Sequence, residues 1–362
     1  MLDTGGEQLS ATVKAKVRKG TLLGADMFHR MLKCTRVSEV AHILKSTYYA
    51  TYLPADVGNL HRDMLEKLLM NAITSEVQSF FPSLGLKRHA FLKLWLQRQD
   101  IQLIKGKIWE IHVGKSDSNV KAKTVNEDYK DTSLTDSSLI NKRKLLLSNS
   151  VDEVIASIKN EKLIMYLKES MKRTSKNINQ TIIMGFALDS FINNRIFDAA
   201  NSFSGKEREG LLSLCGIYMD IMNIISIYRG KKYFNISDEI ILSMIYMHYR
   251  VDFNKLKTIA SLPPNRMWEP LAGTQYASLL PRAENESDDI SSVAGITRRM
   301  RSIQRENALK MFAAGGAGVH FVVAYIVLRE LEILSLSATI EVVRYNYDRS
   351  KVEKLLALSS NI

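Results

Sequence analysis

The chain has 362 residues, of which 46% are apolar, so it can bury more than one hydrophobic core and is expected to form two or three subdomains. Only 6 Pro and 18 Gly favour long helices over a turn-rich β architecture, and the two cysteines, Cys34 and Cys215, exclude a disulfide framework and a cysteine-based zinc site. The net charge of +12 indicates either an acidic partner or solubility alone.

The first 20 residues contain no apolar run, so we expect no signal peptide. They carry the first of three basic clusters, which could bind acidic partners or lipid head groups, although a solvated helix face is the simpler interpretation. No zinc-finger or RNA-binding signature supports nucleic acid as the partner. The clusters are Lys14, Lys16, Arg18 and Lys19; Lys142, Arg143 and Lys144; and Arg298, Arg299, Arg301 and Arg305.

A faint threefold repeat follows. The segment Val37–Leu53 is echoed by Val151–Leu167, an offset of 114 residues, and its second half is echoed by Leu271–Leu280. Tyr49 and Tyr276 occupy matched places in the first and third copies. The repeat predicts three similar helical units, which we place at residues 1–125, 126–250 and 251–362. Triplicated helical units usually present surfaces, whereas enzymes concentrate their chemistry in one asymmetric pocket.

Helical periodicity dominates between these segments. Leu65, Leu69, Ile73 and Val77 predict a helix that starts near Asp63. One longer apolar helix is expected late in each of the three copies, at Phe91–Trp109, Leu211–Phe234 and Phe321–Val342.

The second of these long helices contains a polar pair, Asp220 and Asn223, one turn apart. Because the helix is apolar almost all round, Asp220 is expected to be buried and hydrogen-bonded. An alignment on Lys105-Gly106-Lys107 and Arg229-Gly230-Lys231 places Leu96 and Gln99 in these positions in the first copy. A further offset of 112 residues places Glu332 and Ser335 in these positions in the third copy. The pair could be catalytic, but its partial recurrence favours a structural role, in which it caps or clamps a neighbouring helix end.

Several segments are expected to interrupt the helices. Gly114–Asn149 is predicted to be a polar linker that ends in a basic helix start, and Pro281–Thr297 an acidic loop. Leu262–Asn265 predicts a turn that opens the third copy. Met311–Leu328 is 18 residues without a formal charge, the lower limit for a membrane span, but Gly315, Gly316 and Gly318 predict a break between two helices instead.

Motifs for chemistry are absent from the sequence. The seven histidines form neither HxxxH nor HExxH, and no GxxxxGK[ST], GxGxxG or GxSxG occurs. We therefore expect no catalytic, cofactor-binding or metal-binding residues.

Taken in order, these motifs resemble one known family, the d subunit of vacuolar-type ATPases, which is called the C subunit in the prokaryotic V/A-type enzymes. The run AKVRKGTLLGADMFHRML and the following VSEVAHILKSTYYATYL resemble the opening helices of that family. Asp220, Asn223, Arg229 and Lys231 match its Asp-x-x-Asn … Arg-x-Lys pattern, and Tyr325, Arg329, Glu330, Glu332 and Ile333 match its closing helix. Ser335 replaces the usual Asn, and Glu341 replaces a usual basic residue. The resemblance covers nearly the whole chain.

The resemblance implies an all-α fold, in which three similar helical units with pseudo-threefold symmetry form a funnel and the chain termini pack together. It implies a non-catalytic central-stalk connector that couples ATP hydrolysis or synthesis to ion translocation, lies on the cytoplasmic face of the membrane as a peripheral component and uses no cofactor. The implied partners are the proteolipid c/K ring and the D and F subunits of the central shaft, with the a/I subunit of the membrane sector as a further candidate and no nucleic acid. The implied signature of the repeat is Asp220, Asn223, Arg229, Tyr325, Glu330, Glu332, Tyr49 and Tyr276.

Two alternatives remain open on the residues alone. One is a soluble α-helical repeat scaffold that binds acidic partners or nucleic acid, and the other is an all-α enzyme whose site the sequence hides. The sequence does not indicate whether H⁺ or Na⁺ would be pumped.

Overall fold

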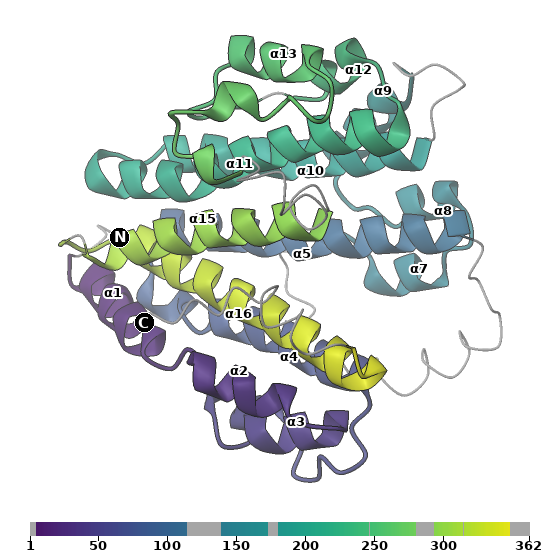
Figure 1. Ribbon diagram of the computed structural model, residues 1–362. Coiled ribbons are helices and arrows are strands. Elements are labelled where there is room, and N and C mark those ends of the chain that lie inside the picture. Colours follow the sequence, from purple (N-terminus) through teal and green to yellow (C-terminus); the bar gives the residue numbers. More distant parts are fainter. Residues whose placement is uncertain are drawn as a thin grey trace. The chain divides into compact units, whose positions relative to one another are not determined.

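The computed structural model describes residues 5–113, 139–172, 180–245, 247–279, 293–313 and 315–347 (Figure 1). In this part of the chain the fold is helical throughout, with no strand and a single isolated bridge between Ile140 and Ile158. The prediction of an all-α fold is confirmed. The chain divides into two compact units, with residues 1–88, 204–214 and 268–362 in unit 1 and residues 89–203 and 215–267 in unit 2. The division into three copies stays a prediction.

Unit 1 is built around α16 (Val319–Tyr345), which is buried on almost every side. The helix has apolar residues all round, and α1, α4 and α15 pack against it together with the shorter α2 and α3. The first and last described helices of the chain therefore lie side by side. The other elements of unit 1 are α1 (Gly5–Lys19), α2 (Ala25–Leu32), α3 (Val37–Leu44), η1 (Tyr48–Tyr52), α4 (Arg62–Gln78), η2 (Phe81–Ser83), η3 (Glu269–Leu271), η4 (Ala277–Leu279) and α15 (Val293–Ala313).

Unit 2 holds most of α5 (Leu86–Val113) and α11 (Gly205–Phe234), the two helices in which the chain passes from one unit to the other. An ion pair of 2.5 Å between Lys105 and Asp189 and a hydrogen bond of 3.1 Å from Arg195 to Gln97 join α5 to α10. Helix α9 packs on α10, and α12 packs on α13. The other elements are α7 (Lys142–Leu147), α8 (Val151–Ala156), α9 (Glu161–Lys172), α10 (Gln180–Asn201), α12 (Asp238–Ser243) and α13 (Phe253–Ser261).

The predicted helix break in Met311–Leu328 is confirmed, because α15 ends at Ala313 and α16 begins at Val319. Gly316 and Gly318 have backbone φ values of +119° and +155°, which residues with a Cβ atom rarely adopt. Among the described residues, α11 is the one helix that is long and apolar enough to cross a membrane, and 61% of that apolar window is buried inside the protein. A core helix has the same length and composition.

The predicted interruptions had mixed outcomes. Helix α4 begins at Arg62 as expected, and the first polar segment ends in the predicted basic helix, α7. The turn at Leu262–Asn265 is present, closed by a bond from the Met267 N–H to the Pro263 carbonyl. The acidic loop was predicted to extend to Thr297. The predicted end is wrong, because α15 begins at Val293. Residues 114–138 and 281–292 of the two predicted polar segments lie outside the described residues.

Candidate functional site

The carboxylate of Glu332 on α16 is a buried hydrogen-bond acceptor in unit 1. It accepts a hydrogen bond of 2.6 Å from the Tyr49 hydroxyl and one from the backbone N–H of Leu23, just before α2. Arg329, one turn earlier and only 1% exposed, forms an ion pair with it. A single side chain of the last helix thus holds two segments from the first 50 residues.

Arg329 is surrounded by aromatic rings and hydroxyl groups. Its guanidinium lies 4.6 Å from the ring centroid of Tyr48, and it donates hydrogen bonds of 3.1 and 3.2 Å to the Tyr325 hydroxyl and of 2.6 Å to Thr21. Burial opposes the charged form, but Glu332 together with Tyr325 and Tyr49 raises the pKa of Arg329. Burial raises the pKa values of Tyr49 and Tyr325. The raised pKa values favour the charged form of Arg329 and the neutral forms of Tyr49 and Tyr325, and these are the forms that their hydrogen bonds in the cluster require.

Asp220 on α11 has a similar position in unit 2. It is fully buried, and its two carboxylate oxygens accept hydrogen bonds of 2.7, 2.8 and 3.2 Å from the backbone N–H groups of residues 249–251. Those residues lead into α13. A carboxylate that accepts several backbone hydrogen bonds fixes the segment that donates them. This geometry supports the structural interpretation of Asp220 over the catalytic one.

A third buried carboxylate, Asp100 on α5, was missed by the sequence reasoning. It is 6% exposed and accepts a hydrogen bond of 2.6 Å from the backbone N–H of Leu139, just before α7. The alignment instead placed Leu96 opposite Asp220. Leu96 and Asp100 are four residues apart and lie on nearly the same helix face, so the apolar periodicity could not separate them. A usable signal was present, because each of the three carboxylates is followed directly by isoleucine, at Ile101, Ile221 and Ile333.

The three carboxylates share one arrangement, which we call the carboxylate clamps of Asp100, Asp220 and Glu332. Each lies on a long helix and binds the backbone just before a short helix: α5 binds before α7, α11 before α13, and α16 before α2. In chain order, the first two clamps each reach forward to the next set of short helices, and the third returns to the first set.

The sequence echo also has local counterparts in the structure. Thr47 Oγ1 donates to the Leu44 carbonyl and accepts from the Tyr49 N–H, with distances of 2.6 and 3.2 Å. The same bonds at the Leu271, Thr274 and Tyr276 turn measure 2.6 and 3.1 Å. Tyr49 and Tyr276 are both buried. The two turns are therefore built alike, 227 residues apart.

A second local match relates the repeated segments Val37–Leu53 and Val151–Leu167. Glu39 on α3 accepts a hydrogen bond of 2.8 Å from the Thr35 N–H, and Glu153 on α8 accepts one of 2.7 Å from the Asn149 N–H. Both glutamates bind the N–H four residues earlier and so close the first turn of a short helix.

The remaining signature residues do not form one site. Asn223 donates a hydrogen bond of 2.8 Å to the Met247 carbonyl, so it holds the same connecting segment as Asp220. Ser335, its predicted equivalent, donates to the Leu331 carbonyl of its own helix at 3.0 Å. Arg229 is exposed on α11, and Glu330 is half-buried on α16.

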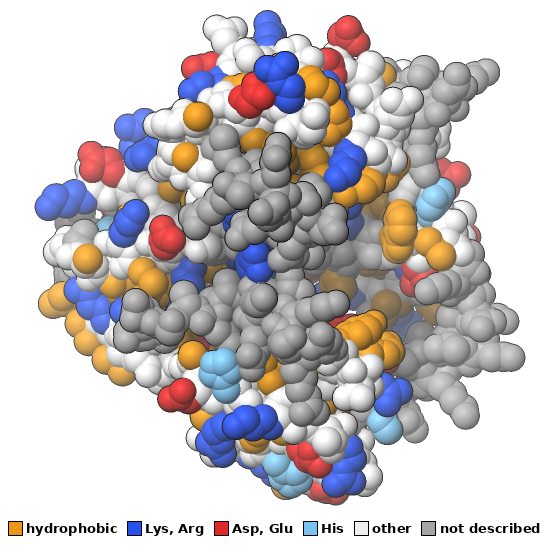
Figure 2. All heavy atoms as spheres, viewed as in Figure 1, with side chains coloured by type: hydrophobic (Ala, Val, Ile, Leu, Met, Phe, Trp, Pro, Cys, Tyr) orange, Lys and Arg blue, Asp and Glu red, His pale blue; other side chains and the backbone are white. Residues whose placement is uncertain are grey.

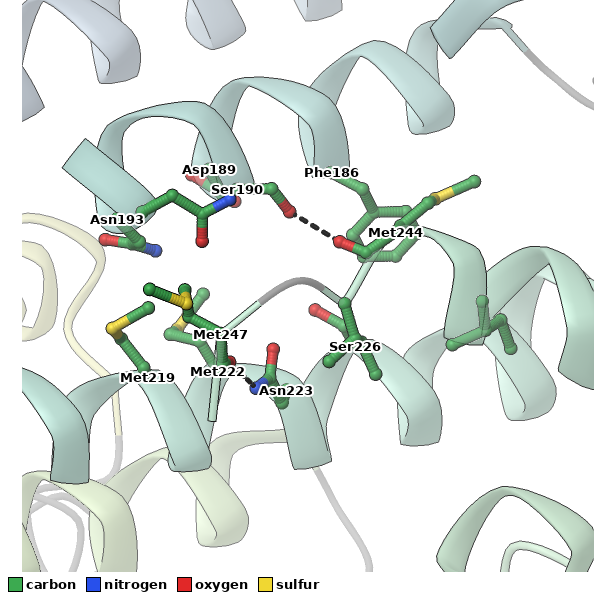
Figure 3. A pocket seen from close by; sticks show the side chains of 13 residues that line it. Phe186, Asp189, Ser190, Asn193, Met219, Met222, Asn223, Ser226, Met244 and Met247 are labelled. Atoms are coloured by element: carbon green, nitrogen blue, oxygen red, sulfur yellow. Dashed lines mark hydrogen bonds between the residues drawn. The ribbon is translucent and has the colours of Figure 1, made fainter. Parts of the chain in front are cut away.

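An open pocket of about 490 Å³ lies between α10, α11 and the segment after α12 in unit 2 (Figure 3). Met219, Met222, Met244 and Met247 line it together with asparagine and serine side chains. Its one carboxylate, Asp189, is paired with Lys105. Lys105 neutralises this carboxylate from outside the lining, and the other side chains that line the pocket carry no charge.

At the start of α16, Glu207 of α11 accepts a hydrogen bond of 2.7 Å from the Val319 N–H and forms an ion pair of 2.6 Å with Arg88. A carboxylate at a helix N-terminus is favoured by the helix dipole. The neighbouring His320 is 5% exposed, and burial lowers its pKa while Glu207 opposes that shift.

Within the described residues, no group of three or more His, Cys, Asp or Glu side chains could hold a metal ion. Cys34 and Cys215 are buried thiols, and burial raises the pKa of Cys215 to about 12, which makes it unreactive. The buried groups described above join helices and connecting segments to one another.

The chain matches the family model described as ATP synthase (C/AC39) subunit over residues 11–355. It is 21% identical over 354 residues to the C subunit of the A-type ATP synthase of Methanobrevibacter smithii, covering 96% of this chain and 87% of that protein. The C subunit of the A-type ATP synthase of Methanocaldococcus jannaschii is 21% identical over 352 residues, with 96% and 86% covered. The corresponding protein of Methanosphaera stadtmanae is 25% identical over 195 residues, with 53% and 50% covered.

Proposed function

Because this chain belongs to the ATP synthase (C/AC39) subunit family of V/A-type rotary ATPases, an accessory and non-catalytic component of the complex, we propose that it connects the central stalk to the membrane sector. In this role it seats the D and F subunits of the shaft on the proteolipid c/K ring. It thereby couples ATP hydrolysis or synthesis to ion translocation. It lies peripherally at the cytoplasmic face of the membrane, where the a/I subunit is a further candidate neighbour.

The observation that carries the proposal is the set of carboxylate clamps. A part that transmits torque must resist the sliding of one helix past another, and each clamp fixes a connecting segment to a long buried helix. Charged hydrogen bonds are about twice as strong as neutral ones, and in a buried site they rigidify the polypeptide. Such joints suit a rigid connector.

The order of the clamps supports the proposed architecture of three helical units with pseudo-threefold symmetry that form a funnel. The units are residues 1–125, 126–250 and 251–362, and the chain ends meet through α1 and α16. A closed threefold order requires the last unit to bind the first, and the bond from Leu23 to Glu332 has this sense. The matched turns at Tyr49 and Tyr276 support the same repeat.

The runner-up function, a scaffold for acidic partners or nucleic acid, has less support. It requires basic clusters that are free to bind a partner. In the first cluster, Lys14 donates a hydrogen bond to the Ser79 carbonyl and Arg18 pairs with Glu76 at 2.5 Å. These cations are used inside unit 1.

The test is an affinity purification from detergent-solubilised membranes of the source organism, using a tagged copy of the chain and nuclease-treated samples. We expect the proteolipid and the shaft subunits to co-purify in fixed ratio. Recovery of nucleic acid without proteolipid would overturn the proposal. In membranes that lack the chain, we further expect ATP hydrolysis by the soluble sector without ion translocation, and coupled translocation without the chain would contradict it.

A further inference from the structure

Methionine side chains are concentrated in the pocket of unit 2. The sequence has two Met-x-x-Met pairs, Met219 with Met222 and Met244 with Met247, and all four side chains line the pocket between α10, α11 and the segment after α12. Figure 3 shows Met219, Met222 and Met247 gathered on one side of the pocket and Met244 on the other. Three thioether groups therefore lie on the same side of one pocket.

Hydrogen bonds to the backbone hold these three methionines at one place. Met219 and Met222 are three residues apart on α11, so their side chains share one helix face. Asn223 donates a hydrogen bond of 2.8 Å to the Met247 carbonyl. The Asp220 clamp holds the residues that follow, through bonds of 2.7, 2.8 and 3.2 Å. The segment that carries Met247 is thus fixed against the turn of α11 that carries the other two methionines.

The pocket has no uncompensated charge that would repel a cation. Its one carboxylate, Asp189, is paired with Lys105 at 2.5 Å, and the other side chains of the lining are apolar, amide or hydroxyl groups. His248, next to Met247 in the sequence, is exposed and does not line the pocket. On the face drawn in Figure 2, the Lys and Arg side chains of the described residues are interspersed with Asp and Glu, so the net charge of +12 is spread over that face.

The thioether is a soft and neutral ligand. Soft sulfur ligands select Cu(I), whereas Mg²⁺ and Ca²⁺ require oxygen ligands. A neutral set of ligands also favours a monovalent ion over a divalent one, because the cost of removing an ion from water rises steeply with its charge. Thioethers are a different class of ligand from His, Cys, Asp and Glu side chains, which form no metal-binding group in the described part of the chain.

The three methionines can also admit an ion and adjust to it. Met219 is only 5% exposed, whereas Met222 and Met247 are half-buried, so the group is open to solvent on one side. Methionine has three rotatable bonds in its side chain, so its sulfur atom can turn toward an ion without a shift of the backbone.

We propose that Met219, Met222 and Met247 form a binding site for a soft monovalent cation, Cu(I), in which the three thioether sulfur atoms are the ligands. Met244, on the other side of the pocket, is not a ligand. The site is formed by unit 2 alone. The inference goes beyond the proposed function and does not depend on it.

The experiment uses the purified full-length chain under reducing, anaerobic conditions. Nuclear magnetic resonance of isotope-labelled methionine methyl groups follows a titration with Ag(I), a soft monovalent probe that does not change its oxidation state. Competition with bicinchoninate measures the affinity for Cu(I). The variants Met219→Leu, Met222→Leu and Met247→Leu each replace one thioether by a side chain of similar volume, a change that cores tolerate. Met244→Leu, in the same pocket, is the matched control, and circular dichroism establishes that each variant folds.

We expect Ag(I) to shift the methyl signals of the three proposed ligands and to saturate at one ion per chain. The loss of an outer-shell partner of a metal site already lowers affinity about 10- to 100-fold, so the loss of a ligand should weaken Cu(I) binding by about tenfold or more. Met244→Leu should bind Cu(I) as wild type does.

Three outcomes would overturn the proposal. The first is a titration of wild type in which the three methyl signals do not move. The second is an affinity for Cu(I) that all three ligand variants retain, which would assign the ion to the thiols of Cys34 and Cys215 or to a histidine. The third is an equal affinity for Zn²⁺, which thioethers alone do not provide. Because these measurements use the isolated chain, their failure leaves co-purification with ATPase subunits, the test of the proposed function, unaffected.

Discussion

At the residue scale, His320 is a buried histidine, 5% exposed, at the start of α16. Its Nδ1 atom has no hydrogen-bond partner among the described residues, and its ring lies 4.4 Å from that of Phe321. Glu207 and Arg88 lie at the same helix start, and Lys16 lies over the Phe321 ring. Burial lowers the pKa of His320 below its usual value of 6.5. The folded protein therefore holds this imidazole in its neutral form.

The pH dependence of stability follows from the direction of that shift. Above pH 6.5 the imidazole is neutral in both the folded and the unfolded protein, so it does not affect the free energy of unfolding. As the pH falls below 6.5, the imidazole of the unfolded chain binds a proton first, and the free energy of unfolding therefore decreases. We expect the melting temperature of wild type to fall between pH 7.5 and 5.5, and His320→Asn to show a smaller fall. His42→Asn, which changes an exposed histidine on α3, is the control and should follow wild type. A His320→Asn profile parallel to wild type would contradict the assignment.

At the scale of elements, α11 and α16 meet where Gly210 faces His320. A Cβ atom at Gly210 would lie 2.8 Å from the His320 ring, closer than real side chains approach one another. Gly185 on α10 is also helical, and a Cβ there would meet nothing within 4 Å. The two glycines have the same helical backbone and different surroundings, so they separate close packing from helix propensity.

We expect Gly210→Ala to lower the free energy of unfolding by about 1–3 kcal/mol, because the added methyl group overpacks the contact. Gly185→Ala should raise it by about 0.5–1 kcal/mol, because alanine has the higher helix propensity. Thermal and urea unfolding of both variants measure the two changes. Equal shifts of the same sign would show that the α11–α16 contact is looser than described.

At the scale of the whole molecule, the carboxylate clamps predict where each unit loosens. We expect Glu332→Gln to speed hydrogen exchange at Leu23 and α2, Asp220→Asn at residues 249–251 and α13, and Asp100→Asn at Leu139 and α7. A hydrogen bond to a charged group contributes about 1.5–3 kcal/mol, so each local increase should be about tenfold or more. Each variant serves as the control for the other two, measured by mass spectrometry. An even increase along the chain would refute the clamps as local joints.

Much of this molecule could be predicted from its sequence, where the physical signal was local. The apolar surroundings of Asp220 predicted its burial, and the glycines at residues 315–318 predicted the end of one helix and the start of the next. The onset of α15 at Val293 was missed because a polar, acidic composition outweighed helix propensity in the prediction.

What could not be predicted depends on tertiary partners. Asp100 needs the N–H of Leu139, and Arg329 needs the rings of Tyr48 and Tyr325, and no periodicity marks such pairs. The three predicted copies contrast with the two compact units for the same reason. A repeat records ancestry in the sequence, whereas compactness depends on which helices pack together, such as α1 with α16.

The pairing of α1 with α16 sets the order in which the protein can be completed during synthesis. Leu23 and Glu332 are separated by 309 residues, so the core of unit 1 cannot close until α16 has left the ribosome. The segments of unit 2, which end at residue 267, emerge earlier and can pack while synthesis continues. Until α16 emerges, the apolar residues of α1 and α4 lack the helix that covers them in the folded protein. A nascent chain that stalls before α16 lacks the helix that covers α1 and α4, and it is therefore a substrate for chaperones.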